Sequence, residues 1–242
     1  MDRKNNCLLC GAELVYFDEP RELECAVCHK TFTANAACKN GHYICDRCHL
    51  REGAAVAVEY CRRTDSRNPV TIMQKLMREP CIHMHGPEHH VLVGAALLAA
   101  CRNSGADVDL DRALREMERR GKQVPGGACG FWGCCGAAVS AGIAVSILSG
   151  ATPLKGGEWG LSNAMTAAAL GEIASYGGPR CCKRDSFTAV RAAVPFIRAH
   201  FGWALELPAR VVCGFSSFNE ECLHERCPYN PSHRTEKTAD GV

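Results

Sequence analysis

The sequence predicts a mainly α protein, in which an all-α cysteine-rich domain follows a small N-terminal zinc-ribbon-like β module. The first fifty residues carry cysteine pairs at C-x2-C spacing, which is the spacing of zinc knuckles. Short β-like stretches, ELVYF and KTFTA, lie between these pairs. Helical signals dominate from Pro80 onward. We therefore divide the chain into a zinc-binding ribbon-like module (1–50), a helical connector (51–79) and the all-α cysteine-rich domain (80–242).

The N-terminal module contains enough ligands for two complete zinc sites. Zinc takes four soft or borderline ligands in a tetrahedron, and the module offers eight: Cys7, Cys10, Cys25, Cys28, Cys38, His42, Cys45 and Cys48. Sequential pairing is favoured, because the stretch from Cys7 to Cys28 alone resembles a zinc ribbon. The alternative is interleaved pairing, which joins Cys7 and Cys10 to Cys38 and His42. We interpret His29 and His49 as spare surface residues beside the knuckles.

The later elements are predicted from helix start and stop signals. Asn68 is the expected N-cap of a helix with Pro69 at its first position. Asp185 is the expected cap of the last helix, and only residues 206–215 look like a strand. The other helices are expected from Pro87 to about Asn103, over LDRALREMERRG, from Gly133 to Leu148, and from Ser162 onward.

Composition limits the compartment and the partners. The 242 residues are 22% charged and 47% hydrophobic with a net charge of +2, which indicates a globular chain with neither nucleic acid nor a membrane as partner. The start, MDRKNN, precedes no apolar segment, and the apolar runs at 91–100 and 137–148 are too short to span a bilayer. We expect a cytoplasmic protein, in which 18 cysteines indicate metal ligands or redox thiols.

The segment CIHMHGPEHH is rich in imidazoles around an expected helix start. One interpretation is that some of these histidines cap the helix and the others are solvated. The other is that at least one is a metal ligand or acid–base group. A zinc-dependent hydrolase would then use His83, His85 and His89 as ligands and Glu88 as base.

Cysteines of the helical domain cluster near three expected helix starts. A helix N-terminus favours thiolates, and three converging loops of this kind could hold an iron–sulfur cluster, such as a 4Fe–4S cluster. Cys135 and Cys182 are the candidate reactive thiols. We interpret Cys61, Cys101 and Cys213 as packing residues. The candidate ligands are Cys129, Cys134, Cys135, Cys181, Cys182, Cys222 and Cys227.

Four segments carry a resemblance to a known family: GPEHHVLV, PGGACGFWGCCGAAVSAGIAVSIL, GGPRCCKR and FNEECLHERCPYN. They resemble an uncharacterised cysteine-rich family of anaerobic bacteria and archaea, domain-of-unknown-function family 5714, whose relatives are sometimes joined to methyltransferase domains. The segment from Cys134 to Leu148 is also similar, in part, to a redox family with a C-GCAxxG-C-C pattern. The resemblance implies an anaerobic setting and sulfur or redox chemistry, and it supplies no reaction.

The leading hypothesis is a metalloprotein of anaerobic metabolism. It would hold two structural zinc ions and an iron–sulfur or thiol-redox site for electron transfer, sulfur transfer or reduction of a small molecule. Its partner would be that small molecule or a redox protein. One alternative is a zinc-binding adapter that docks a partner enzyme such as a methyltransferase, and the other is the zinc-dependent hydrolase.

Overall fold

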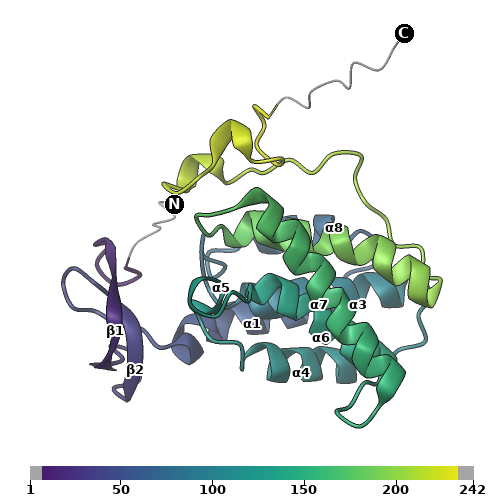
Figure 1. Cartoon of the computed structure of the whole chain (residues 1–242), viewed down its shortest axis with the longest axis horizontal. Helices are drawn as coiled ribbons and strands as arrows, with labels where there is room; N and C mark the ends of the chain where they lie inside the picture. Colours follow the sequence, from purple (N-terminus) through teal and green to yellow (C-terminus); the bar gives the residue numbers. More distant parts are fainter. Residues whose placement is uncertain (1–6, 234–242) are drawn as a thin grey trace.

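A computed structural model describes residues 7–233, and it shows a small β-hairpin beside a bundle of helices (Figure 1). The predicted fold class, mainly α with a small N-terminal β module, is confirmed. The first six residues, on which the expectation about a signal sequence rests, lie outside the described part.

The hairpin forms the N-terminal module. Strands β1 (Leu14–Glu24) and β2 (Thr31–Cys38) pair antiparallel, with Leu14 opposite Cys38 and Glu24 opposite Thr31. An irregularity lies between Tyr16 and Arg21. The turn that joins the strands contains the second C-x2-C pair, so this pair lies at the opposite end of the hairpin from the first.

Helices α1 (Asp46–Arg63) and α2 (Pro69–Leu76) occupy the segment predicted as a helical connector, but α1 begins before residue 51 and both helices pack into the core of the bundle. Helix α1 begins between the last two cysteines of the module, with Cys45 as its N-cap, so module and connector share this helix. Asn68 caps α2 as predicted, because its Oδ1 accepts hydrogen bonds from the N–H groups of Val70 and Thr71.

Helix α3 (His89–Asn103) is the centre of the bundle. It is buried from His89 to Cys101, as expected of a helix that is apolar all round. It contacts α1, α2, α4 (Leu110–Gly121), α6 (Gly136–Ser149) and α8 (Cys182–Phe201), and α7 (Gly156–Tyr176) covers α6 and α8. Small residues allow these close approaches: a methyl group at Gly136 would overlap the ring of His90.

Three local predictions are wrong. Helix α8 begins at Cys182 with Cys181 as its N-cap, and Asp185 lies buried in the first turn. Helix α7 begins six residues before Ser162, because the glycines at 156 and 157 do not prevent a helix start. Residues 206–215 form no strand, since the described part of the chain offers no neighbouring strand to pair with them. A short helix, α5 (Ala128–Phe131), was not predicted.

The C-terminal segment, residues 202–233, crosses the bundle with almost no regular structure. Among its described residues, helical structure is limited to the 3-10 turns η1 (Ser216–Phe218) and η2 (His224–Arg226). It is nevertheless anchored, because Phe215, Leu223 and Tyr229 are buried in the core. No helix within residues 7–233 has both the length and the apolar character that a bilayer crossing needs.

Candidate metal centres

Two ligand clusters in the N-terminal module have the geometry of tetrahedral metal sites. Their members are Cys7, Cys10, Cys38 and His42 in the first site, and Cys25, Cys28, Cys45 and Cys48 in the second. The sulfurs of Cys10 and Cys38 are 3.8 Å apart, as are those of Cys28 and Cys45. A zinc ion with bonds of about 2.3 Å to sulfur separates its thiolates by about 3.8 Å. Both sites could therefore hold a metal ion such as zinc.

The ligand pairing is interleaved, and the favoured sequential pairing is wrong. The antiparallel hairpin places Cys10, which precedes β1, beside Cys38, which ends β2. The same hairpin carries Cys25 and Cys28 to its far end, where the chain returns with Cys45 and Cys48. Sequential pairing would require the two ends of the hairpin to meet.

One thiol in each cluster, Cys10 in the first and Cys25 in the second, has a lowered pKa, whereas burial raises the pKa values of Cys7, Cys45 and Cys48. A backbone N–H of Ala12 and then the His42 imidazole lower the pKa of Cys10 to about 6, and metal binding requires thiolates. His42 Nδ1 lies 3.2 Å from the Cys10 sulfur and 3.6 Å from that of Cys38.

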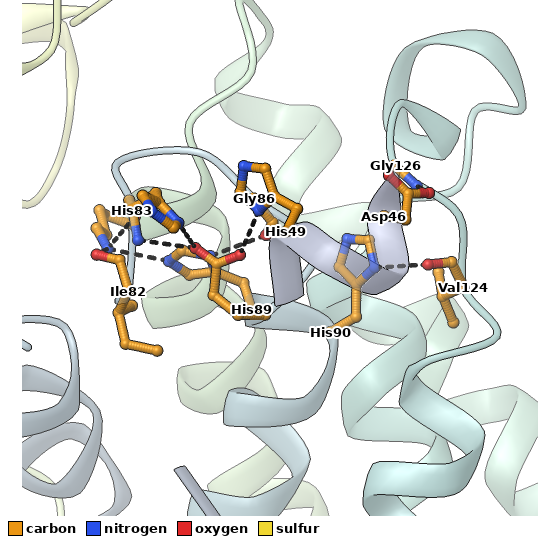
Figure 2. A network of polar contacts seen from close by, with 11 residues as sticks. Asp46, His49, Ile82, His83, Gly86, His89, His90, Val124 and Gly126 are labelled. Carbon is orange, nitrogen blue, oxygen red and sulfur yellow. Dashed lines mark hydrogen bonds and ion pairs between the residues drawn. The ribbon is translucent and has the colours of Figure 1, made fainter. Parts of the chain in front are cut away.

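The second ligand cluster contacts the helical domain directly. Cys45 and Cys48 occupy the start of α1, and Asp46 between them accepts a 2.6 Å hydrogen bond from the N–H of Gly126 (Figure 2). His49 follows Cys48 directly and points into the domain. Its side chain is 19% exposed, so the prediction that His49 is a surface residue is wrong. His29, the residue after Cys28, is exposed as predicted.

His49 meets His83 and Glu88 in a third cluster (Figure 2). Oε2 of Glu88 lies 3.3 Å from Nδ1 of His49, and Oε1 lies 3.4 Å from Nδ1 of His83. Glu88 is fully buried, and its Oε1 also accepts a 2.8 Å hydrogen bond from the backbone N–H of His83. Burial would raise the pKa of Glu88, but the imidazoles of His49 and His83 hold it well below its ordinary value, so the carboxylate is charged.

The other histidines of the segment have different partners. Nδ1 of His89 lies 3.0 Å from the carbonyl oxygen of Gly86, and its Nε2 lies 3.1 Å from Nζ of Lys183. Burial and then the Lys183 ammonium keep the pKa of His89 well below its ordinary value, so this imidazole is neutral and accepts from the lysine. His85 lies apart from the cluster, with Nε2 3.2 Å from Oδ1 of Asn219.

A fourth group consists of cysteines that line one pocket of the helical domain. Three of them, Cys181, Cys222 and Cys227, were candidate ligands, and the fourth, Cys213, was interpreted as packing. Three of the four come from the irregular C-terminal segment, and Cys181 caps α8. Arg184 and Asn219 also line the pocket, and the amide of Asn219 donates to the Cys181 sulfur at 3.6 Å.

Backbone N–H groups surround these four sulfurs. Arg184 donates to Cys181 at 3.4 Å, Phe215 to Cys213 at 3.4 Å and His224 to Cys222 at 3.3 Å. Cys227 accepts from the backbone of Tyr229 and Asn230. Such N–H groups stabilise negative charge on sulfur. Burial outweighs them, because it raises the pKa of Cys181 to about 12 and also raises the pKa values of Cys213 and Cys227. These sulfurs would therefore be thiolates only when a bound metal compensates for their burial.

The remaining candidate cysteines lie outside this pocket. Cys129 belongs to α5 and Cys134 follows it, and Cys135 is the N-cap of α6. The Cys135 sulfur lies 3.8 Å from Oδ2 of Asp185. Burial and then Asp185 raise the pKa of Cys135 to about 12, and burial also raises the pKa of Cys182. The expected lowering by helix N-termini is therefore outweighed by desolvation at both candidate reactive thiols.

The comparison with protein families concerns the helical part of the chain. A family model described as a family of unknown function (DUF5714) matches residues 57–230. The chain belongs to this family. The DUF5714 match includes His83, Glu88 and the four-cysteine pocket, and it begins inside α1, after the module and His49. No curated protein and no solved structure matches the chain.

Sequence reasoning missed two residues that the structure brings into these groups. His49 was missed because nothing in CDRCHLRE shows which side of α1 faces the bundle. A signal was present nonetheless, since His49 and the small residue Gly53 are one turn apart and share a helix face. Cys213 was missed because it stands alone in an apolar stretch, which is typical of packing cysteines.

Proposed function

We propose that this DUF5714 protein is a redox metalloprotein, with zinc in the two N-terminal sites and an iron–sulfur cluster bound by Cys181, Cys213, Cys222 and Cys227. The observation that carries the proposal is the convergence of these four thiols on one pocket, each with a backbone N–H donor. Tetrathiolate sets of this kind bind iron–sulfur clusters, and hydrogen bonds to their sulfurs tune the potential.

The spacing of the thiols favours a cluster over a single zinc ion. Among the described residues, groups of three or more potential ligand atoms that all lie within 4.8 Å of one another occur only in the two module sites and around Glu88. The four pocket thiols are spread more widely. A single zinc ion draws its thiolates to about 3.8 Å, whereas the ligands of a cluster bind different iron atoms and stand farther apart.

A bound cluster also explains how the C-terminal segment is held. Segments of this length without helices or strands are uncommon in compact domains unless something fixes them. Three of the four proposed ligands lie within it, and the fourth caps α8. The cluster would supply electron transfer to a small molecule or to a redox partner protein. The anaerobic setting and the cytoplasmic location stay predictions.

The test is metal and sulfide analysis of protein purified without oxygen. The native chain is expected to contain iron and acid-labile sulfide, two zinc ions, and visible absorption that dithionite bleaches. Cys213→Ser should lose iron and colour but keep zinc. Cys129→Ser is the matched control and should keep both, because Cys129 lies in α5, outside the pocket. Native protein that stays colourless and iron-free after anaerobic reconstitution would overturn the proposal.

An adapter role is the second candidate, and exposed aromatic side chains favour it. Phe131 and Trp132, at the end of α5, are 54% and 69% exposed, and large exposed aromatics are enriched at protein interfaces. A partner enzyme, such as a methyltransferase, could dock there. A third zinc ion in place of iron and sulfide, together with loss of partner binding in Trp132→Ala, would support the adapter over the redox protein.

A further inference from the structure

We propose that His49, His83 and Glu88 bind a divalent first-row transition-metal ion, Zn²⁺ or Fe²⁺, where the N-terminal module joins the helical domain. This site is separate from the two cysteine-rich sites of the module and from the four-cysteine pocket. It also differs from the zinc-hydrolase hypothesis, in which His85 and His89 were ligands and Glu88 was the base.

Three buried polar atoms face one another there without hydrogen bonds. They are Nδ1 of His49, Nδ1 of His83 and Oε2 of Glu88, and none has a hydrogen-bond partner among the described residues. Their residues each offer a ligand atom within 4.8 Å of the others. Buried polar groups are nearly always satisfied, so three unsatisfied atoms that converge on one point indicate a cation site.

The backbone at Gly86 closes one side of the cluster tightly. Gly86 passes over the carboxylate, and a methyl group at this position would overlap Oε2 of Glu88 and lie 2.6 Å from Cε1 of His49. Oε1 of Glu88 is held by the backbone N–H of His83, which orients the carboxylate as a second-shell contact does in metal sites. Lys183 lies nearby and is engaged with His89 and the carbonyl oxygen of His83.

The ligand set identifies the class of ion. Two imidazole nitrogens and one carboxylate oxygen form the set found in catalytic zinc sites and in non-haem iron(II) sites. Three protein ligands leave coordination positions open for water or a small oxygen-containing ligand. Hard ions such as Mg²⁺ and Ca²⁺ prefer oxygen ligands throughout.

The second zinc site positions one ligand of the third. Cys48 and His49 are adjacent at the start of α1, so an ion bound by Cys25, Cys28, Cys45 and Cys48 fixes the turn that carries His49. The other two ligands come from the DUF5714 region. The third site is therefore complete only when the module is folded against the helical domain.

The test uses the full chain with zinc in its cysteine sites. A mild chelator removes weakly held ions, Co²⁺ is added as the probe, and bound cobalt is measured after desalting, together with its visible spectrum. The native chain is expected to bind one Co²⁺ with d–d bands and without the thiolate charge-transfer bands that cysteine ligands give. His49→Ala and Glu88→Gln should each lose this ion.

His29→Ala is the matched control, because His29 also follows a knuckle cysteine but is exposed and paired with Glu24. It should bind cobalt like the native chain. Unchanged cobalt binding in both His49→Ala and Glu88→Gln would overturn the proposal. Parallel metal analysis of protein purified without oxygen distinguishes iron from zinc as the natural ion. Cys213→Ser separates this proposal from the redox function, since it should lose the cluster and keep the cobalt site.

Discussion

Replacement of Gly53 by alanine tests how tightly α1 is packed against the segment that carries Glu88. A Cβ atom at Gly53 would lie 2.8 Å from the carbonyl oxygen of Cys81 and 3.0 Å from Cβ of Glu88. Contacts this short require something to move, and the carbonyl oxygen belongs to the backbone. The added methyl group should therefore push α1, and His49 with it, away from Glu88.

The size of the effect follows from two opposing terms. Overpacking a buried position costs about 1–3 kcal/mol, and alanine gains about 1 kcal/mol over glycine inside a helix. Gly171 provides the control, because it lies inside α7 and a methyl group there would meet nothing within 4 Å. The gain from alanine inside a helix is common to both variants and cancels when their free energies of unfolding are compared. Gly53→Ala should therefore be less stable than Gly171→Ala by about 1–3 kcal/mol.

Urea unfolding of the zinc-loaded variants, followed by far-UV circular dichroism, measures this difference. Gly171→Ala should be slightly more stable than the native chain. Gly53→Ala should also bind Co²⁺ more weakly at the third site, because His49 lies on the displaced helix face. Equal stability of the two variants would refute the packing argument, and it would remove the reason to expect a weaker cobalt site.

Three further predictions concern stability. Phe187→Ala should lower the free energy of unfolding by about 3–5 kcal/mol, because this ring is fully buried in α8. Urea unfolding measures the loss of stability, and a loss under about 1 kcal/mol would contradict the prediction. Asn68→Ala should cost about 1 kcal/mol through loss of the α2 cap, whereas Asn68→Asp should retain most of the stability. Hydrogen bonds from Arg119 and Arg120 lower the pKa of Glu116 to about 2. The ionised Glu116 therefore stabilises the fold above its ordinary pKa near 4.5, and this stabilisation is lost as the pH falls toward 2. Glu116→Gln should thus be less stable at pH 7, by under about 1 kcal/mol, and the difference should shrink in acid; a difference independent of pH would be the contrary result.

Local signals were enough to predict some of the helix starts. Asn68 and Asp109 act as N-caps in the structure, because a side-chain cap depends only on residues two or three positions away. Asp185 failed as a cap because tertiary packing selected Cys181 instead and buried the carboxylate beside Arg184 at 3.0 Å. The strand expected at 206–215 failed for a similar reason, since a strand needs a partner that the sequence alone does not supply.

The ligands of the module could be predicted as a set, but their pairing could not. Spacing identifies zinc knuckles, whereas pairing depends on where the hairpin turns. The third centre was predicted in part, through His83 and Glu88. His49 lies 34 residues before His83 along the chain, and only the docking of α1 against α3 brings them together.

The interleaved pairing determines how much of the chain must be synthesised before each ligand set is complete. The first site cannot close until His42 has left the ribosome, and the second cannot close until Cys48 has followed. Each loop contains ligands of the other site, so a half-made module holds thiols that have no complete ion to bind. The second site is thus complete only once the first turn of α1 has been made. A metal ion in the second site would therefore bind the hairpin and the first turn of the helical domain at the same time.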